Sequence, residues 1–536
     1  MAFTGYAMFE LGDVALPVVL GILLHYLVHA WCYRSHLNLI PGPFPAKFTS
    51  LWKFYVSWKE IMPFTSVDLH EELGPLVRIG PNHISASSAE SLALIHRSRS
   101  GFIKSPMYDL LLPSFEGEIL HNLFSTQDSG IHAALKRKIA PLYTKKALSS
   151  LEFHIDDCIA HFMSAMEIMI RRPENKPIDL GTWLQYYAFD CIGTVNFSRK
   201  MGYLETGQDV DGLCNLEQKK MLEFGTWGQV VPFVKVWMKI RAFFKGPGDQ
   251  NAFFQTALDV VQDRIKHPTE GSDQLNRFLN LHQSDPNEFT VGHVIGATFI
   301  TLVTSHEVVS TALRAVVYYL AKDAKRQERV QNEISEAVRN GKLSNPAQYS
   351  ETQGLPYLSV FEIIGFPVLF PFSNFRGRSI PHQSVNITNC LSLATITEAL
   401  RIHPATGLLL ERVVPKGGAT LHGYFLPEDT LIGVNPWVIN RDKGIFGEDA
   451  HQFRPERWIE SPPTNLVKMR TNLFSFGAGS RNCIGKNLAL MEVNKAVAEI
   501  YRHYNVSLAD PEMSWKVSGH WMTRQWDMDV ILTTRG

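Results

Sequence analysis

Cysteine is scarce and unpaired in this chain of 536 residues. The six cysteines are scattered, with no CxxC pair, at Cys32, Cys158, Cys191, Cys214, Cys390 and Cys483. This pattern indicates reduced thiols in a reducing compartment rather than a disulfide framework. The chain also has no net charge, because 52 basic residues balance 52 acidic ones. The balanced charge therefore gives no support for nucleic-acid binding as a bulk property.

One glycine-rich loop gives a single cysteine a distinctive setting. Residues 476–485 read Phe-Gly-Ala-Gly-Ser-Arg-Asn-Cys-Ile-Gly, and apolar residues at helical spacing follow, among them Ala489, Val493 and Ala496. A loop that leads into a helix N-terminus offers free N–H groups and a positive dipole end, which favour a thiolate on Cys483 and predict a lowered pKa. A buried structural cysteine is the alternative. A lone cysteine cannot form a structural metal site of about four ligands, but it can be the axial ligand of a haem.

Five positions of this loop carry a family resemblance. Phe476, Gly479, Arg481, Cys483 and Gly485 match the fixed positions of the haem-binding loop of cytochrome P-450 enzymes, and the chain resembles that family. The resemblance implies one large, mainly α-helical domain with a small β region. It also implies haem b as cofactor, with the Cys483 thiolate on the iron and Phe476, Arg481 and Gly485 at the haem.

Two further motifs occur in the order that the family has. Glu398 and Arg401 lie three positions apart, and the segment Phe-Arg-Pro-Glu-Arg-Trp at 453–458 precedes the cysteine loop. An isolated charge pair at that spacing is usually surface decoration. The resemblance implies instead that Glu398, Arg401 and Arg457 form a buried ionic network that holds the cysteine loop against the core.

Basic residues are expected at the haem propionates. His132-Ala-Ala-Leu-Lys136-Arg137 opens a helix whose family counterpart sends a cation to a propionate. Many members have Trp four positions before that cation, where this chain has His132, so Lys136 and Arg137 stay open as alternatives, and so does a solvated basic face. Arg412 is expected at the second propionate. An acidic reductase is expected to dock on the same basic patch, which is extended by Lys138, Lys145 and Lys146.

Thr290 to Leu320 is the longest unbroken helical pattern, and it resembles the central helix that crosses the haem. Residues 304–309, Thr-Ser-His-Glu-Val-Val, align with the family stretch Ala/Gly-Gly-x-Asp/Glu-Thr-Thr/Ser. Glu307 keeps the acidic position, but Val308 replaces the threonine that assists proton delivery. Either Thr304, Ser305 or a substrate hydroxyl supplies that function, or the chemistry is not ordinary oxygenation.

Two segments are expected to line a substrate pocket. Residues 102–120 are apolar and irregular, and by analogy they roof the pocket, while a second segment follows the turn at Pro404. The candidates, for which ordinary core packing is the alternative, are Met107, Tyr108, Leu110, Leu111, Ala405, Thr406, Leu408 and Leu409.

The N-terminal region predicts a membrane anchor. Val14 to Tyr33 is largely apolar and about long enough to span a bilayer. Residues 1–13 contain no Lys or Arg, which disfavours a signal peptide, whereas Arg34 and Lys47 on the far side favour a cytosolic catalytic body. We expect a single-pass anchor in residues 1–40, with the span at 14–33, in the endoplasmic reticulum membrane. A proline-rich hinge at 41–48 and the haem domain at 49–536 complete the chain.

Residues 360–393 interrupt a continuous family pattern. Family members run from Leu-Pro-Tyr-Leu directly into the Glu-x-x-Arg helix, whereas here residues 355–359, Leu-Pro-Tyr-Leu-Ser, are followed by a segment broken repeatedly by glycine and proline. Joining Ser359 to Ala394 restores an apolar stripe of Leu358, Ile396 and Leu400. A translated intron is the simplest interpretation, and a real inserted loop is the alternative.

The chain most resembles fungal enzymes of the pisatin-demethylase type, in residues 74–81 and 411–415. The resemblance implies a haem-thiolate monooxygenase that hydroxylates or O-demethylates a small lipophilic molecule in secondary metabolism or detoxification. O2 and an NADPH-cytochrome reductase in trans are the expected partners, since no flavin or nicotinamide fingerprint is visible. The alternatives are a haem-thiolate isomerase or dehydratase, suggested by Val308, and a haem-binding protein left inactive by the insertion at 360–393.

Overall fold

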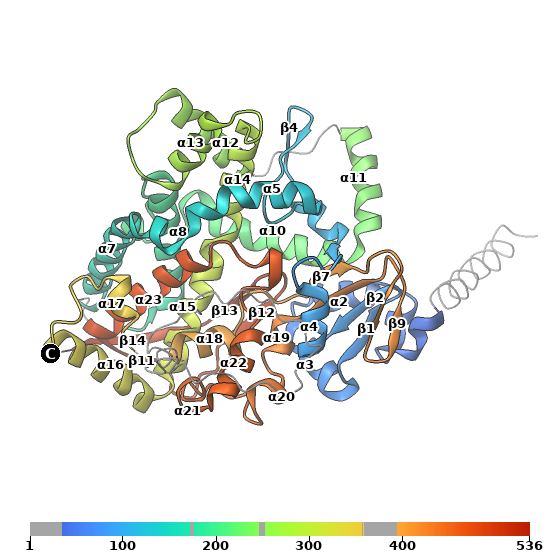
Figure 1. Cartoon of the computed structure of the whole chain (residues 1–536). Coiled ribbons are helices and arrows are strands. Elements are labelled where there is room, and N and C mark those ends of the chain that lie inside the picture. Colours follow the sequence, from blue (N-terminus) through green and yellow to red (C-terminus); the bar gives the residue numbers. More distant parts are fainter. Residues whose placement is uncertain (1–34, 172–175, 246–251, 356, 358–393, 536) are drawn as a thin grey trace, which may run out of the picture.

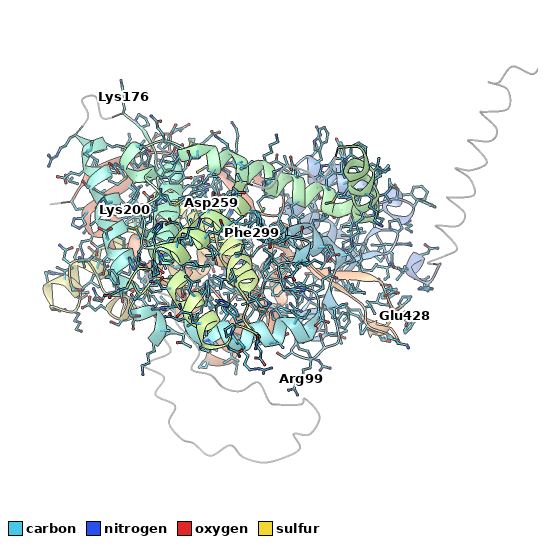
Figure 2. All side chains as sticks on the ribbon, turned by 90° about the horizontal axis from the view of Figure 1, so that it is seen from above. Arg99, Lys176, Lys200, Asp259, Phe299 and Glu428 are labelled. Carbon is cyan, nitrogen blue, oxygen red and sulfur yellow. The ribbon has the colours of Figure 1, made fainter. Side chains whose placement is uncertain are left out.

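The computed structural model describes residues 35–171, 176–245, 252–355, 357 and 394–535. It is mainly helical with small sheets, as predicted, and the helices occupy most of the molecule while the largest sheet lies at one side (Figure 1). Lys200 of the helical part and Glu428 of the sheet part accordingly lie toward opposite sides (Figure 2). The predicted span at 14–33 and the insertion at 360–393 fall outside the described residues.

The first part of the chain is mainly helical and leads to the central helix. Its helices are α2 (Leu51–Trp58), α3 (Met62–Leu73), α4 (Ala89–His96), α5 (Ser129–Ile139), α6 (Lys145–Ser149), α7 (Glu152–Ile170), α8 (Leu180–Phe197), α9 (Tyr203–Thr206), α10 (Leu213–Trp227), α11 (Val231–Lys245), α12 (Ala252–Lys266) and α13 (Gln274–Ser284). Short 3-10 turns include η1 (Ser35–Leu39), η2 (Phe44–Lys47), η3 (Pro106–Leu111), η4 (Ala140–Tyr143) and η6 (Gly228–Val230).

The second half carries the central helix and the cysteine loop. Its helices are α14 (Val291–Thr304), α15 (His306–Ala321), α16 (Ala324–Arg339), α17 (Tyr349–Thr352), α18 (Thr395–Ile402), α19 (Pro436–Ile439), α20 (Lys443–Phe446), α21 (Arg457–Glu460), α22 (Pro463–Asn472), the 3-10 turn η8 (Gly479–Arg481) and α23 (Lys486–His503). Phe299 of α14 lies near the middle of the molecule, close to α12, which carries Asp259 (Figure 2).

The predicted long central helix is present over Val291–Ala321, with a local irregularity at Ser305 that divides it into α14 and α15 while the Ser305 backbone stays right-handed helical. The Thr301 and Thr304 hydroxyls donate to the carbonyls of Ala297 and Ile300, four residues back, at 2.9 and 2.7 Å. Such back-bonding weakens and bends a helix. Val291–Ala321 is also the one run among the described residues that is long and apolar enough to cross a bilayer, but 78% of its most apolar window is buried in the protein.

The largest sheet has the strand order β1-β2-β10-β7-β3. The first two strands form an antiparallel hairpin, and four short strands, β7 to β10, lie between Leu410 and Val434. The strands are β1 (Leu76–Gly80), β2 (His83–Ala86), β3 (Ile103–Lys104), β4 (Ser114–Phe115), β5 (Glu118–Ile119), β6 (Ile178–Asp179), β7 (Leu410–Val413), β8 (Ala419–Leu421), β9 (Tyr424–Leu426), β10 (Leu431–Val434), β11 (Tyr504–Leu508), β12 (Lys516–Gly519), β13 (Thr523–Trp526) and β14 (Asp529–Thr534).

The proline-rich stretch at 41–48 packs against β1 instead of standing apart as a hinge. The Pro41 carbonyl accepts a hydrogen bond from the N–H of Arg78 at 2.7 Å, and Ile40, just before it, is fully buried. A Cβ at Gly42 would lie 2.1 Å from the carbonyl oxygen of Arg78, so only glycine permits this approach. The folded body therefore includes this stretch.

Candidate functional site

The cysteine loop connects α22 to α23 and is closed by a hydrogen bond from the N–H of Cys483 to the carbonyl of Phe476 at 2.9 Å. Gly477 and Gly479 have φ values of +67° and +65°, in the left-handed region that glycine enters without strain. A Cβ at Gly479 would also lie 1.9 Å from the carbonyl oxygen of His96. The loop can therefore pack against α4 only with glycine at this position.

The Cys483 side chain is exposed, yet the surrounding protein is close enough for desolvation to raise the pKa of its thiol. Both observations hold if the sulfur faces an internal space. The pKa is lowered by the N–H groups of Gly485 and Lys486 and by the charges of Lys486 and Lys136, but desolvation is the larger effect. The lowered pKa predicted from the helix N-terminus is therefore wrong for the protein alone, because burial outweighs the dipole. A coordinated metal ion would deprotonate the thiol.

Lys136 reaches the cysteine loop, whereas Arg137 is exposed to solvent. The Lys136 ammonium donates to the carbonyl of Ser480 at 2.6 Å and to Oδ1 of Asn482 at 2.8 Å. Arg481 donates to the carbonyls of Thr126 and Gln127 at 2.7 and 3.0 Å. These two cations thus attach the loop to α5 and to the segment before it.

Above the loop lies a group of cationic and imidazole side chains, here called the cation cluster: His96, Lys104, His132, Arg412 and Arg481. The first four are 4–6% exposed. Burial and the neighbouring cations Arg412 and Arg481 hold the pKa of Lys104 well below its ordinary value. Burial and Arg412 likewise lower the pKa of Arg481, to about 10. So many buried donors without neutralising partners are unfavourable unless an anion joins them.

The nearest carboxylates, Glu411 and Asp128, offset the charge of Arg412 and Arg481 only in part, since burial still lowers both pKa values. Asp128 caps α5 by accepting from the N–H of Ile131, and Glu411 accepts from the Ser105 hydroxyl at 2.7 Å. Both ring nitrogens of His96 are buried without a hydrogen-bond partner in the part of the chain that the structure describes. A haem therefore fits this site. Its two propionates would supply the missing anions, and Cys483 would supply the axial thiolate.

The sequence missed Lys104 and His96. Lys104 lies in the apolar run Phe-Ile-Lys-Ser-Pro-Met, and a single charge inside a stretch expected to be buried was an available signal. His96 gave no such signal, because only the fold brings the end of α4 to the loop. Arg412 and Arg481 were predicted at the haem, and the structure places both in the cation cluster.

The central helix has one open stripe. Between Val294 and Tyr318 all residues are buried except Thr301, Thr304, Ser305 and Val308, which recur at helical spacing. Tyr143 of η4 lies beside both Thr301 and Cys483, and burial raises its pKa to about 12. Tyr143 therefore links the start of the stripe to the cysteine loop. Val308 brings no hydroxyl to the stripe, whereas Thr304 does, one turn earlier.

Glu307 is placed off this stripe. Its carboxylate accepts from Nε2 of Gln185 at 2.7 Å and from Nη1 of Arg314 at 3.4 Å, and it is 2% exposed. The structure thus brings Thr304 and Ser305 to the open side of the helix and places Glu307 behind them, toward α8.

Four aromatic side chains, Tyr108, Phe124, Phe224 and Trp521, pack together and are here called the aromatic cage. Trp521, between β12 and β13, makes edge contacts with Tyr108, Phe124 and Phe224 at centroid distances of 5.8, 5.8 and 5.1 Å. Among the predicted pocket residues Met107, Tyr108 and Leu408 are buried, and Leu110, Leu111, Ala405 and Thr406 are half-buried. Leu409 was wrongly included, because it packs with Val77 and Ile79 of the sheet. The predictions missed Trp521 and Phe224, which only the fold brings beside Tyr108.

Glu398, Arg401 and Arg457 form one buried network. The Glu398 carboxylate accepts from Arg401 at 2.8 and 2.9 Å, from Nε of Arg457 at 2.9 Å and from the indole N–H of Trp458 at 2.8 Å. Arg401 and Glu398 are fully buried and Arg457 is 1% exposed. Because Ser475 donates to the carbonyl of Leu400 at 2.7 Å, the helix that carries this network also contacts the start of the cysteine loop.

Comparisons with known proteins agree with this geometry. The cytochrome P-450 family model matches residues 40–361 and 387–524. The cytochrome P-450 monooxygenase gsfF of Penicillium aethiopicum is 32% identical, with 98% of each chain covered, and a cytochrome P-450 monooxygenase of Aspergillus terreus is 32% identical over 92% of this chain and 94% of its own. The monooxygenase mpaDE' of Penicillium brevicompactum is 30% identical over 97% of this chain, which spans only 57% of that longer protein.

Proposed function

Because the chain belongs to the cytochrome P-450 family, we propose that it is a haem-thiolate monooxygenase. The observation that carries the proposal is an exposed but desolvated Cys483 beside the cation cluster, whose charge the described carboxylates offset only in part. Haem ligated by thiolate supplies the activation of O2. In the chain itself, Cys483 would hold the iron, Lys104, Arg412 and Arg481 would bind the propionates, and the aromatic cage would help to exclude water.

Oxygen labelling tests this function. The full-length protein is reconstituted with haem, a reductase, NADPH and a panel of lipophilic compounds under ¹⁸O2. Incorporation of one labelled atom, or labelled formaldehyde released from a methoxy group, would support it. Product formation that continues without O2 and NADPH would contradict it.

The proposed substrate is small and lipophilic. Phe124 is half-buried, and Tyr108 and Trp521 pack against it and are at most 2% exposed; an apolar site with few polar groups binds apolar scaffolds. The relatives are fungal monooxygenases, which supports secondary metabolism or detoxification and the oxidations named above, O-demethylation included.

A second candidate function is a haem-thiolate isomerase or dehydratase. Val308 favours it, because the open stripe lacks the hydroxyl that the family places there. Turnover without O2 would distinguish it. We favour the monooxygenase, since Thr304 presents a hydroxyl on the same stripe one turn away.

The segment 360–393 bears on whether the printed chain is active. The carbonyl of Tyr357 accepts from the backbone N–H of Thr395 at 3.0 Å and from its hydroxyl at 2.6 Å. If Ser359 were joined to Ala394, Thr395 would follow Tyr357 by four positions, and this bond would be an ordinary α-helical one. The family match also omits residues 362–386. Both observations support an insertion into the first turn of α18, from a translated intron or a loop.

Membrane attachment and a separate reductase complete the proposal. An exposed apolar patch supports the proposal of membrane attachment. It comprises, each 46–64% exposed, Leu51, Tyr55 and Trp58 of α2 and Phe233, Val236, Trp237, Met238 and Ile240 of α11. Exposed patches rich in aromatic residues mark membrane or partner surfaces. On the cysteine-loop side, Arg137 and Lys146 are exposed and could attract an acidic reductase. Lys138 is instead paired with Asp285 and Glu288.

A further inference from the structure

The largest sheet carries charged groups on both faces, and one face has no part in the proposed reaction. Lys104 of β3 and Arg412 of β7 are paired in register, so both side chains point to the face that carries the cation cluster. Ser105 and Glu411 come next along the two antiparallel chains, so their side chains point to the opposite face. There the Ser105 hydroxyl donates to the Glu411 carboxylate at 2.7 Å. A carboxylate therefore lies on the reverse of the sheet behind two buried cations.

A line of buried polar groups, here called the rear chain, extends from this carboxylate to α2: Ser105, Glu411, His83 and Lys53. Each is at most 3% exposed. Nε2 of His83 lies 3.6 Å from Oε1 of Glu411, slightly beyond hydrogen-bond length, and Nδ1 of the same ring lies 2.8 Å from the ammonium of Lys53. An ammonium only donates, so Nδ1 accepts, and the proton of a neutral ring is on Nε2, toward the carboxylate.

A glycine leaves room for the rear chain on the sheet. Gly433 of β10 is paired with both Ser85 of β2 and Glu411 of β7, so a side chain at 433 would stand on the face of the rear chain. A Cβ at Gly433 would also lie 3.2 Å from the Cα of Glu411. Ser85 is bonded to Nε2 of His70 at 2.7 Å. His83, two residues before Ser85 on the same strand, is therefore the ring that faces Glu411.

The two ends of the rear chain keep each other charged. Burial raises the pKa of Glu411, while Lys53, the Ser105 hydroxyl and Arg412 act to lower it. Burial lowers the pKa of Lys53, and Glu411 acts to raise it. Burial and Lys53 hold the pKa of His83 well below its ordinary value, so the ring is neutral. The rear chain is thus an ion pair with an imidazole between its charges, and its negative end adjoins Arg412.

Stability alone gives little reason for a buried ion pair here. Desolvation of two charges offsets most of their attraction, and apolar residues of similar volume often stabilise a core as well. Lys104 and Arg412, in contrast, benefit from a carboxylate behind them, because like charges directly opposite each other on neighbouring strands repel. Burial lowers the pKa of Arg412, whereas Tyr108 and Glu411 raise it. The field of Glu411 therefore reaches a side chain that the proposed function places at a propionate.

We propose that Glu411, held by Lys53 through His83, sets the reduction potential of a haem bound in the site. The inference rests on the proposed function, because it concerns the haem whose propionate would meet Arg412. A negative charge behind Arg412 weakens the positive field at the haem and so favours the oxidised state over the reduced one. Lys53 keeps that charge in place. Glu411, His83 and Lys53 lie on the other face of the sheet from the cation cluster, act through Arg412 and are positioning residues.

Potentiometric titration of the haem-loaded protein tests the proposal without turnover. Glu411→Gln keeps an acceptor for Ser105 but removes the charge. It should raise the ratio of reduced to oxidised haem at a fixed potential on the order of tenfold, which is about 59 mV for one electron. The matched control is Glu428→Gln, at an exposed carboxylate outside the rear chain, and it should leave the potential unchanged. An unchanged potential in Glu411→Gln would overturn the proposal.

Lys53→Met separates the field of Glu411 from damage to the fold. Without its cation the buried carboxylate should take up a proton, so the potential should rise as in Glu411→Gln. The double variant should shift no further than Glu411→Gln alone, because both changes remove the same charge. Lys59→Met, at an exposed lysine next to α2, is the control and should have no effect. Shifts that add in the double variant would contradict the proposal.

Infrared spectroscopy of the same proteins supplies a readout that does not depend on the potential. Lys53→Met should show one more band of a buried protonated carboxylic acid than wild type, and the double variant with Glu411→Gln should lose it. Absence of the added band in Lys53→Met would overturn the role of Lys53. A normal thiolate-type reduced-CO spectrum in each variant verifies that haem is bound at Cys483. If wild type lacks that spectrum, the proposed function fails, whereas a normal spectrum with an unmoved potential overturns the tuning alone.

Discussion

At the residue scale, Cys483 carries the strongest prediction. Cys483→Ala should abolish the thiolate-type CO spectrum and all turnover, because no other described side chain in the loop is a thiol. Cys483→Ser can keep haem but should lose the thiolate signature. Cys158→Ser is the control: this thiol lies in the core against the Thr194 hydroxyl at 3.0 Å, and its replacement should leave the spectrum intact. An unchanged spectrum in Cys483→Ala would refute the assignment.

Val308 tests the role of a hydroxyl on the open stripe. Val308→Thr adds a hydroxyl beside that of Thr304 and should raise product per NADPH, by up to about tenfold, while peroxide release falls. Val309→Thr is the matched control, since Val309 is 3% exposed on the buried side. Its hydroxyl should lower stability by about 1–3 kcal/mol without improving coupling. If Val308→Thr leaves coupling unchanged, Thr304, Ser305 or the substrate already supplies the function.

Acid should destabilise the protein through Glu398. Burial alone would raise the pKa of Glu398, but Arg401, Arg457 and the N–H of Arg454 together hold it below its ordinary value. The stabilisation is therefore complete above about pH 4.3, the ordinary value, and is lost as pH falls through the folded-state pKa.

Glu398→Gln tests this dependence in chemical unfolding at several pH values. It should lower the free energy of unfolding at pH 7 by about 3–5 kcal/mol, because two buried guanidinium groups lose their partner. The substitution should also weaken the decrease in the free energy of unfolding as the pH falls below about 4.3. Glu448→Gln, at a side chain 92% exposed, should change neither quantity. Equal acid profiles for wild type and Glu398→Gln would contradict the assigned cause.

Residues close in sequence were predictable, and those assembled by the fold were not. The Cys483 loop and the partners of Glu398 lie in short motifs, and the residue spacing within these motifs predicts their chemistry. Lys104 reaches the cation cluster from β3, and its only local mark is a single charge in an apolar run. Trp521 reaches the cage from the β12–β13 hairpin, and no local pattern marked it. The pKa of Cys483 was mispredicted for the same reason: a helix N-terminus is visible in sequence, whereas the desolvation that outweighs it is tertiary.

At the element scale, the start of α18 indicates whether residues 360–393 are an insertion that interrupts a helix. Deleting 360–393 places Thr395 four positions after Tyr357 and makes their hydrogen bond part of a continuous helix. We expect the shortened chain to bind more haem, to give the thiolate CO spectrum and to melt at a higher temperature than the full chain. Deleting 361–393 instead leaves one extra residue and rotates Thr395 by about 100° around the helix axis. This second deletion variant should bind less haem and melt at a lower temperature than the first. Equal haem binding by the full chain would favour a real loop.

The central helix shows which structural features the apolar periodicity of the sequence can predict. Its apolar rhythm correctly predicted a long buried helix from Thr290 to Leu320. The rhythm did not predict the interruption at Ser305, because that follows from the Thr301 and Thr304 hydroxyls returning to their own helix. The interruption lies within the open stripe, so the same hydroxyls that bend the helix are those offered to the reacting space.

At the scale of the whole molecule, α2 and α11 lie on one side, together with η1, where the described chain begins (Figure 1). Ring contacts join the two helices: Phe54 of α2 lies 5.1 Å from Trp227, which stacks on Phe233 of α11 at 6.2 Å. The apolar patch is thus one surface, next to the part of the chain where an anchor at 14–33 would enter.

Vesicle binding tests whether this surface enters a membrane. A protein that begins at residue 35 should still bind phospholipid vesicles, because burial of Phe233 and Trp237 contributes about 1 kcal/mol each. Replacing both by serine should weaken binding by about thirtyfold, which corresponds to roughly 2 kcal/mol. The matched control replaces Phe153 and Ile168 of α7, on the opposite side in Figure 1, which are 57% and 63% exposed. It should bind as the unsubstituted protein does, and equal loss in both pairs would show that exposed apolar area alone, not this patch, drives binding.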